Sequence, residues 1–305
     1  MTRVPLLPVA VAAAALTAVL WEGRRRSWER ESAASFPVGD DGIIVGAQSI
    51  RLGRGGAGLL LLHGFGDTPQ SMRALAESLH AAGWTVRVPL LPGHGRTLRE
   101  FARSRAPDWI AAAGYALAEL RGECDSVSLV GQSMGGAIAL MLAASSPPVD
   151  ALVLMAPYLS MTPAAARLAR LHRAGSLVVP YIRSAAEHSR LDPGARRAAL
   201  GFGMTTPRLL HELLVVVTRA QAAATAVRSP TLVVHSTQDH RIPPAAAERA
   251  FARLGGRPKT LRWMERSGHV LSADMERDEI AALVAAWLKL HAGAAPTTGT
   301  QPAAT

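Results

Sequence analysis

Residues 126–144, SVSLVGQSMGGAIALMLAA, contain the pattern that decides the fold. The apolar beginning predicts a strand at 126–130, and the alanine- and leucine-rich run predicts a helix at 134–144. Between them, Gly131-Gln132-Ser133-Met134-Gly135 fits the G-x-S-x-G pattern of a sharp strand-to-helix turn. Such a turn strains the backbone at the serine and needs glycine where neighbouring chains approach closely. We therefore expect Ser133 at an exposed tip at the helix N-terminus, where developing negative charge is stabilised; the alternative is a chance glycine–serine turn.

The rest of the chain alternates between strand and helix patterns. Short apolar runs predict strands, and apolar residues at helical spacing predict helices. The expected strands lie at 58–63, 85–88, 151–155, 231–235 and 260–263, and the expected helices at 70–82, 108–122 and 275–291. This alternation predicts an α/β fold, with a mostly parallel central sheet flanked by helical layers.

One segment, from Pro157 to about Thr206, interrupts this rhythm without a strand suited to the central sheet. Thr162-Pro163 predicts a short helix within it, and Thr206-Pro207 predicts a longer helix after it. Because the segment follows a sheet strand, we expect it to project over the carboxyl edge of the sheet, where ligands bind in such folds. Residues 157–206 are therefore predicted to form a small helical cap.

A serine hydroxyl becomes a good nucleophile only when a base takes its proton, so a histidine and an orienting acid are expected. After a turn of this kind they follow in the order acid, then histidine, on loops after later strands. Asp239 follows the strand at 231–235, and His269 follows the strand at 260–263. Other candidates are interpreted as loop or helix-cap residues: His240, Asp274 and Asp278.

Two backbone N–H groups are expected to face the developing oxyanion. Phe65 follows the strand at 58–63 within His63-Gly64-Phe65-Gly66, and Met134 directly follows the candidate nucleophile. These two positions commonly supply the donors beside such a serine. His63 and His94 are interpreted as structural residues of tight turns.

These motifs together resemble the α/β-hydrolase superfamily, and within it the bacterial carboxylesterase and monoacylglycerol lipase group. The resemblance covers residues 58–292 and depends on 59–65, 70–82, 92–96, 131–136, 239–243 and 268–269. It implies ester hydrolysis through an acyl-enzyme, with Ser133, Asp239 and His269 as triad and Phe65 and Met134 as oxyanion hole.

The expected substrates are acyl lipids such as monoacylglycerols, or similar esters of medium or long chain length. Thioesterase, lysophospholipase, C–C hydrolase and acyltransferase activities are alternatives with the same triad, and a non-catalytic binding module is another. Ser133 excludes haloalkane dehalogenases and many epoxide hydrolases, because these need a carboxylate nucleophile.

The N-terminus predicts a membrane anchor over residues 1–30. Val4–Trp21 carries no charge and is followed by Arg24, Arg25, Arg26 and Arg30. As a helix it would reach about 27 Å, close to the ~30 Å of a hydrocarbon core. The positive-inside rule then predicts a single span with the main domain, residues 31–292, in the cytoplasm. A cleaved signal peptide and a surface-lying helix are alternatives, and residues 293–305 are predicted to be a disordered tail.

Composition excludes several classes of protein. The single cysteine among 305 residues, Cys124, excludes an internal disulfide framework and a cysteine metal cluster. The formal charge is +10, but only two of the 33 basic residues are lysines and aromatic residues make up 5%, which argues against nucleic-acid binding. No ligand cluster or phosphate-binding loop is present in the sequence, so we expect neither a metal nor an organic cofactor.

Overall fold

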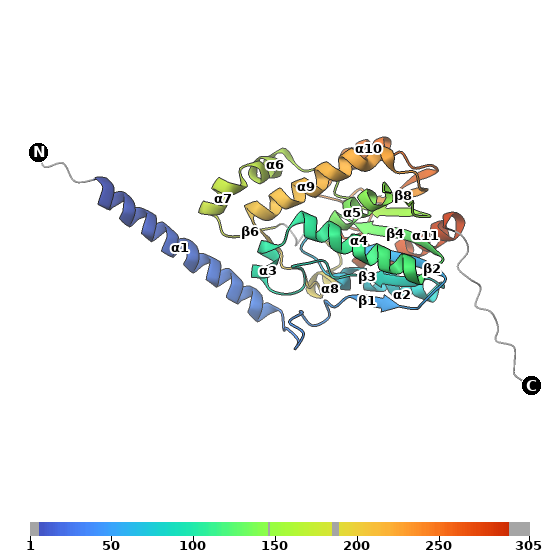
Figure 1. Cartoon of the computed structure of the whole chain (residues 1–305), viewed down its shortest axis with the longest axis horizontal. Helices are drawn as coiled ribbons and strands as arrows, with labels where there is room; N and C mark the ends of the chain where they lie inside the picture. The colour runs from blue at the N-terminus through green and yellow to red at the C-terminus, as the bar shows by residue number, and fades with distance from the viewer. Residues whose placement is uncertain (1–5, 146, 185–188, 293–305) are drawn as a thin grey trace, which may run out of the picture.

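The computed structural model describes residues 6–145, 147–184 and 189–292, and a seven-stranded sheet lies at the centre of this part of the chain (Figure 1). The strand order is β1-β3-β2-β4-β5-β8-β9. The β1–β3 pair is antiparallel and every other pair is parallel. The strands are β1 (Ile50–Leu52), β2 (Ala57–Leu62), β3 (Thr85–Val88), β4 (Ser126–Gln132), β5 (Leu152–Met155), β8 (Thr231–Ser236) and β9 (Lys259–Met264). The mostly parallel sheet predicted from the alternation is confirmed.

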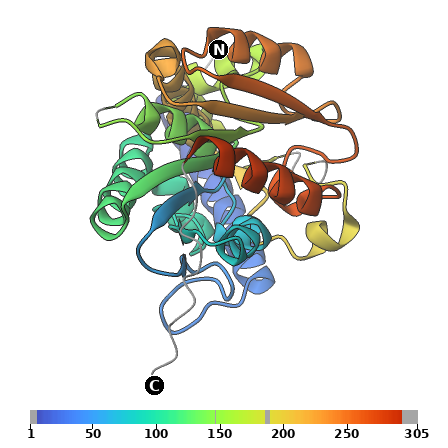
Figure 2. The same cartoon turned by 90° about the vertical axis from the view of Figure 1, so that its right-hand side faces the viewer.

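Helices cover both faces of the sheet (Figures 1 and 2). One face packs against α4 (Ala106–Glu123), α5 (Met134–Ala143) and α9 (Pro207–Ala223), and the other against α2 (Arg73–Ala81) and α11 (Arg277–His291). The four leucines of β2 alternate between the two cores: Leu60 and Leu62 point to the first, and Leu59 and Leu61 to the second. All four are fully buried, which stabilises the fold by about 1.5–3 kcal/mol for each side chain.

The segment between β5 and α9 contains short elements that do not join the central sheet. They are α6 (Pro163–Arg170), α7 (His172–Val178), β6 (Ile182–Arg183), α8 (Pro193–Arg197) and β7 (Met204–Thr205). Thr162 and Thr206 cap α6 and α9 through their side-chain oxygens, as the Thr-Pro pairs predict. The small antiparallel β6–β7 sheet was not predicted, and neither were α3 (Leu98–Arg103), α10 (Pro244–Arg253) and edge strand β1.

The first helix, α1 (Leu6–Ser35), continues without a break through the arginine-rich segment. In its second half, Arg25 pairs with Glu22 and Glu29, and Glu29 accepts a hydrogen bond from the hydroxyl of Tyr181 at 3.0 Å. Trp21 Nε1 donates to the carbonyl of Ser176 at 3.1 Å. This half of α1 therefore packs against the segment between β5 and α9.

The predicted membrane anchor is wrong. None of the helices in the described part of the chain combines the length and the apolar character that crossing a membrane requires. The helix that contains most of the predicted span carries a charged half, whose ion pairs and contacts tie it to the rest of the chain. Val4 and Pro5, at the start of the predicted span, lie outside the described residues, as does the predicted tail at 293–305. The predictions of a membrane partner and of a cytoplasmic main domain depended on this span, so neither has support from the structure.

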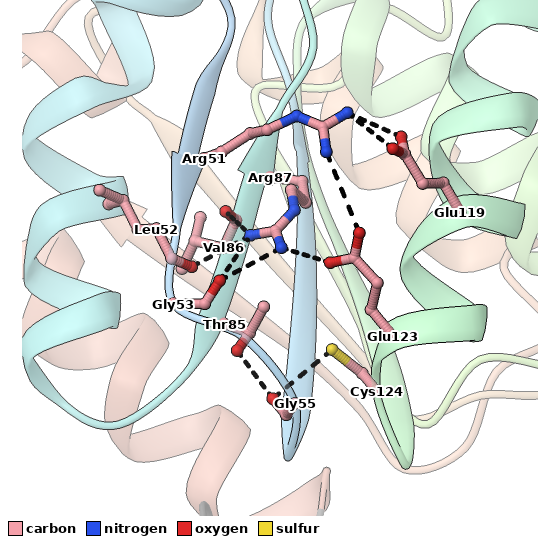
Figure 3. A network of polar contacts seen from close by, with 10 residues as sticks. All are labelled: Arg51, Leu52, Gly53, Gly55, Thr85, Val86, Arg87, Glu119, Glu123 and Cys124. Carbon is pink, nitrogen blue, oxygen red and sulfur yellow. Dashed lines mark hydrogen bonds and ion pairs between the residues drawn. The ribbon is translucent and has the colours of Figure 1, made fainter.

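A polar network holds the antiparallel edge of the sheet (Figure 3). Arg87 of β3 is buried and pairs with Glu123 at the end of α4. Its guanidinium also donates to three carbonyl groups, those of Leu52, Gly53 and Val86. Arg51 of β1 binds Glu119 of α4 with N–O distances of 2.8 and 2.9 Å. Side chains thus fasten a strand of only three residues to its neighbours.

Candidate active site

The turn between β4 and α5 has the strained geometry that its glycine pattern predicts. Ser133 has φ 55° and ψ −119°, a conformation that side-chain-bearing residues rarely adopt. A Cβ at Gly131 would lie 2.4 Å from the carbonyl oxygen of Gly135, and one at Gly135 would lie 2.1 Å from that of Leu62. Both distances are too short for any side chain. Glycine at these positions therefore lets the chain turn sharply enough to present Ser133 at the carboxyl edge of the sheet.

Three predicted side chains meet at this edge. His269 Nε2 lies 2.8 Å from Ser133 Oγ, and His269 Nδ1 lies 2.7 Å from Asp239 Oδ2. They follow the carboxyl ends of β4, β8 and β9, so the parallel sheet brings together residues that are 30 and 136 positions apart. All three are buried. This chain of contacts can pass the serine proton to the imidazole while the carboxylate holds the other ring nitrogen.

The carboxylate of Asp239 is held in its ionised form. Burial raises the pKa of this carboxyl group. The hydrogen bond and the charge of His269, the backbone N–H of Ile242 and the charge of His235 lower it by more, so the pKa lies below its ordinary value. Asp239 Oδ1 accepts the N–H groups of Arg241 and Ile242 at 2.8 and 3.0 Å. These bonds fix the orientation of the carboxylate toward the histidine.

The other histidines near the site have structural surroundings. His63 Nε2 accepts the N–H of Leu91 at 3.2 Å, so its Nδ1 carries the proton and donates to the carbonyl of Gly64 at 2.9 Å. Burial lowers the pKa of His63 and, to a greater extent, that of His94. His94 is enclosed by the rings of Phe65, Phe101 and Trp109. Both histidines shape the loop that carries Phe65.

A cavity of about 260 Å³ opens in front of Ser133 and His269. Phe65 lines it from the loop after β2, and Ser184 and several residues between Ser189 and Leu213 also line it, among them the apolar side chains of Met204, Leu210 and Leu213. Met134 is the first residue of α5. In the described chain, neither the Phe65 nor the Met134 N–H donates to a protein acceptor. Phe65 lines the cavity, and Met134, which directly follows Ser133, is fully buried.

Asp274 contributes to the site in a way that sequence reasoning missed. Its carboxylate accepts four backbone N–H groups, from Leu191, Asp192, Gly268 and Met275. It therefore joins the segment before α8 to the residue that precedes His269. Only its position before the final helix was visible in the sequence, and that suggested a helix cap. The residues with described structure contain no group of three or more His, Cys, Asp or Glu that could hold a metal ion.

Comparison with known proteins agrees with this arrangement. A model of the hydrolase family described as serine aminopeptidase S33 matches residues 56–276. The chain belongs to this family. It is an α/β-hydrolase of the carboxylesterase and monoacylglycerol lipase group, an ester-hydrolysing serine hydrolase.

The chain is similar to several named lipases and esterases. The thermostable monoacylglycerol lipase of Bacillus sp. (strain H-257) is 28% identical over 251 residues, which is 82% of this chain and 98% of the lipase. A carboxylesterase of Bacillus subtilis (strain 168) is 28% identical over 73% of this chain and 89% of its own. The solved structure of one of the metagenome-derived lipolytic enzymes LipS and LipT is 31% identical, with a TM-score of 0.75 over 82% of this chain and all of that chain.

Proposed function

We propose that Ser133, His269 and Asp239 form a catalytic triad that cleaves carboxylic esters through an acyl-enzyme. The observation that carries this proposal is the pair of contacts of His269, with Ser133 Oγ 2.8 Å from Nε2 and Asp239 Oδ2 2.7 Å from Nδ1. In this arrangement Nε2 accepts the hydroxyl proton as Oγ attacks the ester carbonyl, and Asp239 stabilises the imidazolium that forms.

The N–H groups of Phe65 and Met134 are proposed to hold the oxyanion. Support comes from the absence of a protein acceptor for either N–H group in the described chain, from the position of Met134 directly after Ser133, and from the cavity that Phe65 and Ser133 both line. The N-terminus of α5 adds a favourable dipole. Donors fixed on the backbone stabilise the tetrahedral intermediate without reorganising, and removing one such donor typically slows a reaction about 100- to 1000-fold.

The second half of the reaction uses the same groups. The imidazolium of His269 gives its proton to the leaving alcohol as the C–O bond breaks, which leaves the acyl group on Ser133 Oγ. His269 then takes a proton from a water molecule, whose oxygen attacks the acyl carbon. The new tetrahedral intermediate collapses, Oγ recovers the proton, and the carboxylic acid leaves.

The proposed substrates are acyl lipids such as monoacylglycerols, or similar esters of medium or long chain length. The names of the lipase relatives support this class, as do the apolar cavity walls formed by Phe65, Met204, Leu210 and Leu213. We also infer that about 157–206 acts as a cap on a hydrolase domain of residues 31–292, because Ser184 and several residues between Ser189 and Thr205 line the cavity.

The test compares Ser133→Ala with Ser128→Ala, a matched variant of the same strand. Ser128 Oγ is buried and has no hydrogen-bond partner in the described structure, so its loss leaves the site unchanged. We expect Ser133→Ala to lower kcat for p-nitrophenyl butyrate by about 10⁴- to 10⁶-fold and to abolish labelling by a fluorophosphonate probe. Ser128→Ala keeps both activities. A Ser133→Ala protein that folds and retains its rate refutes the assignment, and a chain-length series of esters defines the acyl preference.

A further inference from the structure

The wall of the cavity carries more positive than negative charge. Its charged lining residues, apart from His269, are three arginines, Arg190, Arg196 and Arg241, and one carboxylate, that of Asp67. Ester hydrolysis by the proposed triad uses none of these guanidinium groups. Their presence beside Ser133 therefore calls for a separate explanation.

The carboxylate of Asp67 is already occupied. Arg190 Nη2 lies 2.7 Å from Asp67 Oδ2, and both side chains are buried, so the two charges compensate each other. Arg196 donates to the carbonyl of Arg190 through Nε and Nη2, at 3.3 and 3.0 Å. These bonds place two of the three guanidinium groups, and among the described lining residues they leave no further carboxylate to pair with the third.

Arg241 is that third group. It lies two residues after Asp239, and its Nε donates to the hydroxyl of Ser189. Among the described residues, no carboxylate lies within 4.0 Å of its guanidinium, because Asp239 is directed to His269 and to backbone N–H groups. Burial lowers the pKa of Arg241 below its ordinary value. The nearby carboxylates of Asp239 and Asp67 and the hydroxyl of Tyr158 offset part of this effect without forming a direct ion pair with Arg241. A partly buried cation without a direct ion pair is costly, and a bound anion relieves that cost.

We propose that the cavity binds ester substrates that carry a carboxylate or a phosphate, and that Arg241 is the residue that recognises this anionic group. The planar guanidinium presents paired N–H donors that match both anions. Tyr158 lines the same cavity, and its hydroxyl is a candidate for a further donor. The inference deepens the proposed function and rests on it: Ser133 cleaves the ester while Arg241 selects a charged substrate.

Two matched pairs of short, soluble esters test the proposal and distinguish where the anion sits. Monomethyl adipate against dimethyl adipate, compared per ester group, places the charge on the acyl side. 1-Butyrylglycerol 3-phosphate against 1-butyrylglycerol places it on the alcohol side. We expect kcat/KM to favour the anionic member by about 10-fold or more in at least one pair. No preference in either pair overturns the proposal.

Variants then assign the preference to one residue. Arg241→Gln is expected to lower kcat/KM for the anionic ester by a much larger factor than for the neutral ester, mainly through a higher KM for the anionic ester; Arg241→Lys restores part of the preference. Arg249→Gln, which removes the same charge from an exposed position on α10, leaves the preference intact. An equal loss on both esters in Arg241→Gln shows that the residue only holds Ser189, and overturns the proposal.

A measurement without variants guards against misfolding. Adipate or glycerol 3-phosphate should inhibit hydrolysis of p-nitrophenyl butyrate competitively in the unaltered protein, and less at high ionic strength. Absence of inhibition by both anions counts against the site. If the unaltered protein hydrolyses no ester, the proposed function has failed; calorimetric binding of the two anions to it and to Arg241→Gln then decides the anion site independently.

Discussion

Asp274→Asn tests whether a buried carboxylate couples the cap to the candidate catalytic histidine. Asp274 Oδ1 accepts the N–H groups of Asp192 and Met275 at 2.7 and 2.9 Å, and Oδ2 accepts that of Gly268 at 2.7 Å. Leu191 N–H contacts both oxygens. An asparagine has one oxygen, so its best orientation keeps the Oδ1 contacts and turns its NH₂ group toward the N–H of Gly268.

The size of the effect follows from these contacts. One buried N–H loses its acceptor, which costs about 1–3 kcal/mol, and the remaining bonds change from charged to neutral acceptors. We expect the free energy of unfolding to fall by about 3–5 kcal/mol in total. Because Gly268 precedes His269, the ring loses part of its support, and an error of about 1 Å in its position lowers kcat by about 10- to 100-fold.

The assay combines urea unfolding with steady-state hydrolysis of p-nitrophenyl butyrate. Asp278→Asn is the matched control: it lies in the first turn of α11 with its side chain 92% exposed, and should change neither quantity. An Asp274→Asn protein with stability within about 1 kcal/mol and kcat within about twofold of the original refutes the reasoning. Lower stability with an unchanged kcat refutes the coupling to His269 alone.

Further predictions concern the turn, the sheet edge and buried histidines. Gly135→Ala should cost more than about 4 kcal/mol or prevent folding, because its Cβ meets a backbone carbonyl, whereas Gly122→Ala, with open space around it, should be neutral or slightly stabilising in circular dichroism melts. Arg87→Leu should lower stability by about 2–4 kcal/mol in urea without changing kcat/KM, since it releases the edge network far from the cavity. Burial lowers the pKa values of His63, His94 and His235 in the folded protein. Below about pH 6.5 the unfolded chain therefore binds more protons than the folded one, so the free energy of unfolding falls as the pH drops, by up to about 1.4 kcal/mol per pH unit for each histidine. Urea unfolding at pH 7.5, 6.5 and 5.5 measures how the free energy of unfolding changes with pH. His94→Phe should make this pH dependence weaker by the contribution of one histidine, and an unchanged pH dependence contradicts the prediction.

The centre of the sheet was predictable because β2, β5 and β8 are buried on both faces, so their sequences are short apolar runs. β3 coincides with its prediction at 85–88, and β2 and β8 differ from theirs by a residue at one or both ends. The order of strands in the sheet was not predictable from the runs themselves. Strand β1 was missed because it is an edge strand of three residues, of which only Ile50 is buried, so it gives no apolar pattern.

The candidate triad was predictable because its geometry follows from topology. Parallel strands end at the same edge, so polar residues just after β4, β8 and β9 had to lie close together. The structure brings Ser133, Asp239 and His269 into contact; their catalytic roles stay a prediction. Asp274 and Arg241 could not be found in the same way, since their partners come from the segment around Ser189, whose path over the sheet has no signature in the sequence.

The N-terminal helix shows how a local pattern can mislead. The membrane span was predicted from the length of the apolar run before Glu22 alone. The helix instead continues to Ser35, and its charged half contacts Ser176, Tyr181 and Arg183. These partners lie about 150 residues away in the sequence. No window of the N-terminal sequence contains this information, so the packing of α1 could be learned only from the tertiary structure.

The contacts around Ser189 imply that specificity and rate are coupled in this protein. The carbonyl of Ser189 accepts the N–H of Val270, next to His269, at 2.9 Å, and its hydroxyl accepts from Arg241. Two residues further on, Leu191 is bound by Asp274. One short segment thus supports both the candidate catalytic histidine and the proposed anion-binding arginine. A substitution that displaces this segment should therefore lower kcat and weaken the discrimination between anionic and neutral esters together, whereas a change confined to the apolar wall should leave that discrimination unaltered.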